Sequence, residues 1–259
     1  MTMTMNLFDS NLYLGRPTRG AYAPAATSAE LLAEMDRQGI GRALAWHVAQ
    51  RDVSPVTGNA MLSEAIAGQP RLYGCWTILP PQTREVFRKG EDFFAAMGRN
   101  RILGLRAFPG QHNFLLNRLV FGKWLDEIAA RRIPLLLSLE NGVTWPMVYQ
   151  LLEAYPTLTC VLCDIGIWGV DRYTWPLLEN YPNVYLETSL VALEDGGMEA
   201  TVAQYGAERL LFGSAFPARY PESAILQLRH AEISDEDRHM IASTNLERVI
   251  AQVALEVEK

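Results

Sequence analysis

Eight short apolar runs, spaced almost evenly along the chain, restrict more than any other feature how this sequence can fold. Their starts recur every 25 to 37 residues, and most, such as Ile133-Pro-Leu-Leu-Leu, are nearly continuous in apolar residues. Such runs are typical of parallel strands that are covered on both faces. We therefore predict strands at residues 5–14, 42–48, 71–78, 102–108, 133–140, 158–166, 184–189 and 209–215.

Helical patterns separate these runs. The first has a Thr27-x-x-Glu30 capping box at its start and Gly39 at its end, the signals of a helix N-terminus and C-terminus. Further helical patterns follow the eighth run, and we predict that the last helix begins at a second capping box, Thr244-x-x-Glu247.

Eight units of strand and helix predict an α/β fold, a single (β/α)8 TIM barrel with extra C-terminal helices. An open doubly wound sheet is the alternative, but the even spacing of the eight units favours closure. No linker, low-complexity segment or charge block interrupts the pattern, so we expect one domain over residues 1–259.

Composition excludes several classes of partner. The net charge is −6, with 23 Lys+Arg against 29 Asp+Glu, and we expect no nucleic-acid partner. All three cysteines lie in apolar runs, which favours a reducing compartment, and no run has the length of a membrane helix. We expect a cytoplasmic protein that binds a small molecule and does not contact a membrane, with a homo-oligomer left open.

The active site of a TIM barrel forms at the carboxyl ends of its strands. Position alone therefore nominates the polar, aromatic and small residues that stand at these ends: Asn11, Tyr13, Trp46, His47, Cys75, Trp76, Arg106, Ser138, Glu140, Asp164, Glu187, Thr188, Ser189, Ser214 and Ala215.

Segments spread over the whole chain resemble the amidohydrolase-related family. Residues 210–217, Leu-Leu-Phe-Gly-Ser-Ala-Phe-Pro, with 233–238 and 244–250, look like the end of that family, and Phe8-Asp-Ser-Asn-Leu-Tyr-Leu-Gly15 looks like its first strand. Residues 133–138, 162–166 and 183–189 supply intermediate matches. The resemblance implies a TIM barrel of the metal-dependent hydrolases and decarboxylases, in which a divalent ion activates water or binds substrate.

The chain departs from the family at the positions of the metal ligands. Asn11 and Tyr13 stand where the resemblance implies a His-x-His pair, Ser138 and Asp164 where it implies histidines, and Ala215 where it implies an aspartate. Zinc prefers imidazole, thiolate and carboxylate ligands, and one carboxylate is a weak site for Mg²⁺. We therefore expect neither a metal nor any other cofactor.

Asp164, Arg106 and His47 are the candidates for catalysis. Asp164 would act as general acid or base, or would merely accept loop N–H bonds or pair with Arg106. Arg106 would clamp an anion or neutralise Asp164, and His47 would be a general base or a hydrogen-bonded packing residue.

Other residues are candidates for binding. Asn11, Tyr13 and Ser138 would supply hydrogen bonds to a substrate. Glu140 would add a second carboxylate or stay solvated, and Glu187 would act on substrate or form an ion pair.

Tryptophans at strand ends predict an aromatic-lined pocket, although the same side chains would also fit a plug in the barrel top. They are Trp46, Trp76, Trp145 and Trp168. The resulting hypothesis is a metal-free hydrolase, or a lyase, acting on an ester, lactone or similar small polar substrate. The alternatives are a noncatalytic ligand-binding protein, a pseudoenzyme in this sense, and a structural subunit.

Overall fold

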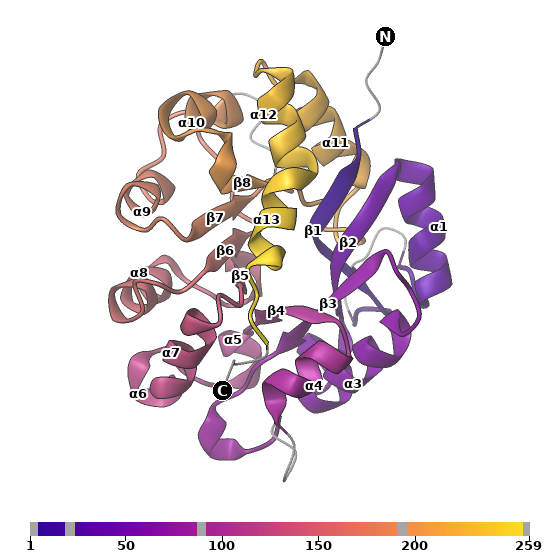
Figure 1. Cartoon of the computed structure of the whole chain (residues 1–259), viewed down its shortest axis with the longest axis vertical. Helices are drawn as coiled ribbons and strands as arrows, with labels where there is room; N and C mark the ends of the chain where they lie inside the picture. The colour runs from indigo at the N-terminus through magenta and orange to yellow at the C-terminus, as the bar shows by residue number, and fades with distance from the viewer. Residues whose placement is uncertain (1–4, 19–23, 87–91, 191–195, 256–259) are drawn as a thin grey trace.

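One parallel sheet of eight strands forms the centre of the molecule (Figure 1). The computed structural model describes residues 5–18, 24–86, 92–190 and 196–255. The strands are β1 (Leu7–Leu14), β2 (Ile40–His47), β3 (Leu72–Thr77), β4 (Ile102–Arg106), β5 (Leu135–Ser138), β6 (Cys160–Cys163), β7 (Val184–Glu187) and β8 (Leu210–Leu211). They pair in sequence order, as in a TIM barrel and unlike a doubly wound sheet, in which the order reverses.

Backbone hydrogen bonds join the first strand to the segment that follows the last. Ser10 N donates to Phe212 O at 2.9 Å, and Tyr13 N donates to Phe216 O at 2.9 Å. The two-residue β8 is shorter than the predicted run because Phe212 N donates to Ile241 O instead of to a neighbouring strand. The apolar run thus continues as irregular buried chain, and it closes the barrel.

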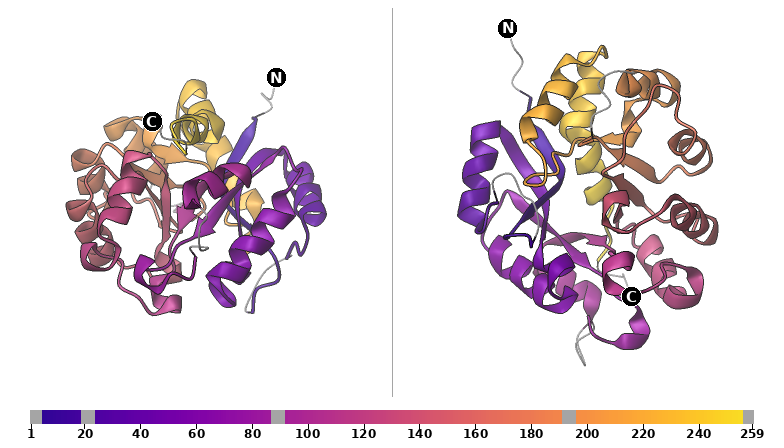
Figure 2. Two further views of the ribbon diagram at one scale, coloured as in Figure 1. Left: turned by 60° about the horizontal axis from the view of Figure 1, so that its bottom comes forward. Right: turned by 180° about the vertical axis from the view of Figure 1, so that it is seen from behind.

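Helices surround the strands (Figures 1 and 2). They are α1 (Ser28–Gln38), α2 (Ala49–Asp52), α3 (Pro55–Ile66), η1 (Pro81–Thr83), α4 (Phe93–Arg99), α5 (Pro109–His112), α6 (Arg118–Phe121), α7 (Lys123–Ala130), η2 (Leu139–Asn141), α8 (Trp145–Ala154), α9 (Thr174–Asn180), α10 (Gly197–Tyr205), η3 (Ala207–Arg209), α11 (Pro221–His230), α12 (Asp235–His239), η4 (Met240–Thr244) and α13 (Asn245–Ala251). None of the described helices has the length and apolar composition needed to cross a membrane.

The predicted start and end of α1 are confirmed. Glu30 N donates to the Thr27 hydroxyl at 3.2 Å, and Thr27 N donates to the Glu30 carboxylate at 3.2 Å. Gly39 ends the helix at φ +72°, in the left-handed region that favours glycine.

The last helix, α13, begins at the predicted position, with Thr244 directly before Asn245, but the predicted capping box is not formed. Thr244 has helical angles, φ −61° and ψ −36°, and its side chain caps nothing. A π-helical turn, η4, instead connects α12 to α13 without a break. The turn has a structural use, because Ile241 O accepts from Phe212 N and Asn245 Nδ2 donates to Leu210 O at 2.9 Å. Both bonds attach the C-terminal helices to β8.

A separate apolar cluster fills the inside of the barrel. Its members come from every strand except β4, from Val48 and Phe108, which follow β2 and β4, and from α13, which passes across one end of the ring (Figure 1): Phe8, Tyr13, Leu44, Trp46, Val48, Cys75, Phe108, Leu136, Val161, Cys163, Tyr185, Leu211, Leu246 and Val249. Phe8, Leu246 and Val249 share this cluster, so α13 closes the end of the barrel where the strands begin. The three cysteines are buried and free.

Gly58 allows α3 to pack directly on α2. A Cβ at this position would lie 2.2 Å from Gln50 N and 2.4 Å from Gln50 Cα, both of them backbone atoms. Gln50 in turn donates its side-chain amide to Asn59 at 2.7 Å and to Cys75 O at 2.9 Å. This contact therefore supports the end of β3.

We expect Gly58→Ala to lower the free energy of unfolding by at least about 2 kcal/mol, because backbone cannot move aside as a flexible side chain can. The matched control is Gly98→Ala in α4, where a Cβ would meet only Leu255 Cδ1, at 3.7 Å. That change should leave stability unchanged or raise it by up to about 1 kcal/mol. Urea denaturation of both variants checks the difference, and equal stabilities would contradict this view of Gly58.

Candidate active site

Asp164 is held by three side chains at the carboxyl end of β6. Its Oδ1 accepts from Asn11 Nδ2 at 3.3 Å and from Arg219 Nη1 at 3.3 Å, and its Oδ2 accepts from the Ser138 hydroxyl. Asn141 donates to the same hydroxyl at 2.7 Å. The backbone of Asp164 is left-handed, with φ +56°, a conformation that aspartate tolerates better than most residues.

The amide of Asn11 connects opposite charges. Its Oδ1 accepts from Arg106 Nη2 at 2.7 Å, while its Nδ2 donates to Glu187 Oε2 at 2.9 Å as well as to Asp164. Asn11, Arg106 and Glu187 are 3%, 1% and 0% exposed. Arg106 is therefore connected to the carboxyl groups of Asp164 and Glu187 through the Asn11 amide. The ion-pair partner of Asp164 is Arg219 instead of the expected Arg106.

Glu187 is a buried acid beside a second carboxylate. Burial and the charge of Asp164 raise its pKa to about 8, although bonds donated by Asn11, by Ser189 and by Asp164 N act in the opposite direction. A Cβ at Gly213 would lie 2.1 Å from Glu187 Oε1, so glycine is needed there to make room for the carboxyl group. At neutral pH the Glu187 carboxyl group is therefore largely protonated.

Glu140 joins the group from outside. Its side chain is 52% exposed, in agreement with the interpretation of Glu140 as a solvated carboxylate. Arg219 Nη2 donates to its Oε1 at 2.5 Å, so that Arg219 bridges Glu140 and Asp164.

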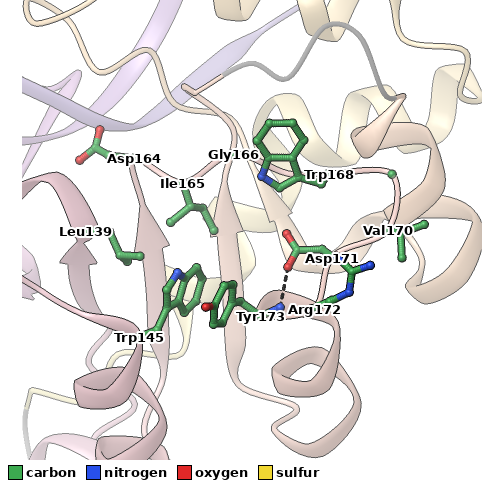
Figure 3. A pocket seen from close by; sticks show the side chains of 11 residues that line it. Leu139, Trp145, Asp164, Ile165, Gly166, Trp168, Val170, Asp171, Arg172 and Tyr173 are labelled. Atoms are coloured by element: carbon green, nitrogen blue, oxygen red, sulfur yellow. Dashed lines mark hydrogen bonds between the residues drawn. The ribbon is translucent and has the colours of Figure 1, made fainter.

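A pocket of about 1160 Å³ opens beside Asp164 (Figure 3). Its lining consists of Leu139, Trp145, Asp164, Ile165, Gly166, Trp168, Gly169, Val170, Asp171, Arg172 and Tyr173. The rings of Trp145 and Tyr173 stack with centroids 4.8 Å apart and planes 4° apart. Trp168, which also lines the pocket, is 54% exposed. We call this space the rim pocket.

One known protein family matches almost the whole sequence. The sequence profile described as "Amidohydrolase" matches residues 8–250. The chain belongs to the amidohydrolase family. No curated protein matches the sequence.

Solved structures resemble the fold of this amidohydrolase-family chain. The 5-carboxyvanillate decarboxylase of Sphingomonas paucimobilis has a TM-score of 0.68 at 14% identity, over 95% of this chain and 99% of that one. The dihydroxybenzoic acid decarboxylase of Polaromonas sp. JS666, solved with manganese and 2-nitroresorcinol, has 0.71 at 16%, over 95% and 97%. A probable 2-pyrone-4,6-dicarboxylic acid hydrolase of Acinetobacter baumannii, solved with citric acid, has 0.67 at 16%, over 95% and 100%.

Two of the predicted site residues of the amidohydrolase-family barrel lie away from Asp164. Trp76 packs against Phe93 on the helix side of β3, with ring centroids 5.7 Å apart, and its indole N–H donates to Ser63 at 3.0 Å. His47 is buried, and its Nδ1 accepts from Ala49 N at 3.1 Å. Burial lowers the pKa of His47.

Tyr13 and Trp46 lie inside the barrel instead of in the rim pocket. Their ring centroids are 4.6 Å apart, and Trp46 also contacts Phe108 at 5.3 Å. These rings fill the centre of the barrel mouth, as the plug interpretation predicts, while Trp168 lines a pocket to one side, as the pocket interpretation predicts.

Arg219 and Asp9 are the residues that sequence reasoning missed. Arg219 lies in the loop after β8, where no strand pattern indicates a side-chain direction. Asp9 stands two residues before Asn11, and its Oδ1 accepts from Asn11 N at 2.9 Å and Ser214 N at 3.1 Å. Burial raises the pKa of Asp9 to about 6. A carboxylate within a buried apolar strand was the available signal for Asp9.

These two acids predict a pH dependence of stability. The folded chain keeps a proton on Glu187 up to about pH 8, whereas the unfolded chain releases it near the ordinary value of 4.5. Stability is therefore highest below pH 4.5 as far as Glu187 is concerned, and it falls as the pH rises toward 8, by an amount on the order of a few kcal/mol.

Glu187→Gln should flatten the fall between pH 6 and pH 8 in denaturant unfolding curves. Asp9→Asn is the matched control, because its contribution ends near pH 6 and the upper part of the fall should persist. An unchanged slope above pH 6 in Glu187→Gln would show that Glu187 is ionised in the folded protein.

Proposed function

We propose that this chain binds a small, flat, polar molecule in the rim pocket and hydrolyses an ester or lactone bond in it without a bound metal, with Asp164 as general base. The observation that carries the proposal is that Asp164 belongs both to the buried hydrogen-bond network and to the lining of the rim pocket. The Acinetobacter relative is named as a probable hydrolase of a pyrone dicarboxylic acid, which supports a flat lactone as the substrate class.

The donor set does not fit the divalent ion that the family implies. At the matching positions stand the amide of Asn11, the phenol of Tyr13, the hydroxyl of Ser138, one carboxylate and the methyl group of Ala215. The Asn11 oxygen accepts from Arg106. Among the described residues, no group of three or more His, Cys, Asp or Glu side chains could hold a metal. The proposed hydrolysis therefore proceeds without a metal ion.

The Asp164 carboxylate keeps one lone-pair site that can accept a hydrogen bond from a water molecule or from the substrate. A carboxylate offers about four lone-pair sites, and three are occupied by Asn11, Arg219 and Ser138. The remaining site, on Oδ2, would accept the proton of a water whose oxygen attacks the carbonyl carbon. When the bond from that carbon to the leaving oxygen breaks, Asp164 returns the proton to the leaving oxygen. The Arg219 guanidinium lies beside the developing oxyanion and holds the carboxylate in place.

The rim pocket supplies the binding surface for a flat molecule. The stacked rings of Trp145 and Tyr173 offer an apolar wall, and the side chains of Trp168 and Arg172 belong to the same lining. An aromatic wall with a few polar groups is typical of small-molecule sites. Figure 3 shows Asp164 set apart from these rings along the same pocket, so one molecule would stack and react at different points.

Noncatalytic ligand binding is the second candidate function. It is favoured by the aromatic lining of the rim pocket, which would hold a ligand even if the three donors to Asp164 give that carboxylate a structural role alone.

We expect protein treated with EDTA and dialysed to hydrolyse members of a panel of aryl esters and aromatic lactones, such as phenyl acetate and dihydrocoumarin, at an undiminished rate. Asp164→Asn should lower that rate at least about a hundredfold, since general-base catalysis contributes roughly 10²- to 10⁴-fold. The matched control is Glu140→Gln, which removes the charge of the other partner of Arg219 but keeps an acceptor oxygen, and which should change the rate less than about twofold.

Elemental analysis of protein purified without chelators completes this test. A stoichiometric metal whose removal abolishes turnover would overturn the metal-free proposal. Saturable quenching of tryptophan fluorescence by a panel member that is not turned over would support the second candidate.

A further inference from the structure

A chain of hydrogen bonds connects Asp164 to Arg51, a cation outside the lining of the rim pocket. Arg51 lies in α2 and donates from Nη1 to Asn141 Oδ1 at 3.0 Å. Asn141, the last residue of η2, donates from Nδ2 to the Ser138 oxygen at 2.7 Å. The Ser138 hydroxyl donates in turn to Asp164 Oδ2. We call these four residues the donor chain, and it joins the segments that follow β2, β5 and β6.

The guanidinium of Arg51 fixes the direction of every bond in the donor chain. A guanidinium carries donors only, so the Asn141 amide presents its oxygen to Arg51 and its nitrogen to Ser138. A serine hydroxyl carries a single proton. Because Asn141 donates to the Ser138 oxygen, that proton is available to Asp164. A reversed Asn141 amide would set its nitrogen against the guanidinium, and its oxygen would take the Ser138 proton away from Asp164.

Arg51 is itself held in place by neighbours outside the donor chain. Its Nε donates to Asp52 Oδ1 at 2.6 Å, and Thr18 donates its backbone N–H and its hydroxyl to Asp52 Oδ2 at 3.0 and 3.2 Å. The guanidinium also lies over Trp46, with Cζ 5.7 Å from the centroid of the ring. The side chains of Arg51 and Asp52 are 19% and 10% exposed. The donor chain therefore begins at a cation that has little freedom to turn away from Asn141.

We propose that Arg51 and Asn141 are positioning residues for the hydrolysis proposed above, on which this inference rests. They keep the Ser138 hydroxyl as a donor to Asp164 Oδ2, and this bond helps to hold the carboxylate in one orientation for the attacking water. A catalytic group that is free to turn loses rate. Neither Arg51 nor Asn141 lines the rim pocket, so both act on the chemical step and not on substrate binding.

The kinetic test uses the aryl esters and lactones of the panel above with variants of the full chain. Asn141→Leu keeps nearly the shape of asparagine but makes neither bond. It should lower kcat about tenfold and change KM less than about twofold, because the orientation of Asp164 is lost and the binding surface is kept. Arg51→Met should give a similar loss. Arg51→Lys keeps a side chain with donors only and should recover kcat to within about threefold of the wild type.

A double variant distinguishes a chain from two separate effects. A chain is interrupted only once, so Arg51→Met combined with Asn141→Leu should be no slower than Asn141→Leu alone. A loss near the product of the two single losses would overturn the inference, as would a kcat in Asn141→Leu within twofold of the wild type. Asn141→Leu keeps the test valid if Arg51→Met does not fold.

Arg118→Met is the matched control. Arg118 also pairs with an aspartate, Asp126, and lies over an aromatic ring, that of Tyr155, but none of its described contacts is with the donor chain. This variant removes the same charge and should leave kcat and KM unchanged.

NMR of the Asn141 side-chain amide tests the donor chain without hydrolysis. In protein labelled with ¹⁵N, this amide gives the side-chain signal that is missing in Asn141→Leu. We expect its protons to exchange slowly with solvent and to show NOE contacts to Ser138 Hβ in the wild type and in Arg51→Lys. Both features should be lost in Arg51→Met, and their persistence there would overturn the inference.

The two readouts separate failure of the donor chain from failure of the proposed function. If the wild type hydrolyses no member of the panel but the amide signals behave as expected, the proposed hydrolysis fails, while the role of Arg51 and Asn141 in orienting Ser138 stands. If hydrolysis occurs and the variants keep the kcat of the wild type, the proposed function stands and the positioning role fails.

Discussion

The side-chain amide of Asn11 separates the buried charges of this barrel and holds them at the same time. Its oxygen faces the Arg106 guanidinium and its nitrogen faces the carboxylates of Asp164 and Glu187. An amide can do this because it is donor and acceptor at once, whereas an ionised side chain in its place would repel one of its neighbours. Asn11 thereby holds Asp164 beside the rim pocket and connects it to Arg106. Its bond to Glu187 opposes the burial and the charge of Asp164, which raise the pKa of Glu187.

The architecture was predictable from sequence because it depends on periodicity. Apolar runs at regular intervals define the eight strands, and the caps of α1 follow from local chemistry at Thr27 and Gly39. The predicted C-terminal capping box is not formed, although Thr244 and Glu247 have suitable spacing, because the preceding residues continue the helix through a π-helical turn. Hydrogen bonds to β8 from distant residues stabilise that turn, and local patterns do not contain them.

The predicted site residues differ in how far the sequence determines the direction of their side chains. Asn11, Ser138 and Asp164 were nominated through the family resemblance, and the structure brings them together. Trp76 follows Cys75 by one residue, so a shift of one position in strand register decides whether it faces the barrel or the helices, and the sequence does not contain that register. Arg219 comes from irregular chain after β8. Its approach to Asp164 depends on the closed barrel, which no single segment determines.

Closure of the ring by the two ends of the chain has a consequence for biosynthesis. On the side away from β2, the described backbone hydrogen bonds of β1 go to Phe212 and Phe216, and Phe8 shares an apolar cluster with Leu246 and Val249 of α13. During translation the first strand therefore leaves the ribosome with one edge unpaired, and it stays so until residues 212–216 have been made. Unpaired strand edges favour aggregation. The separation of these partners in sequence thus leaves the nascent chain with an aggregation-prone edge that a strand paired with its sequence neighbours would not have.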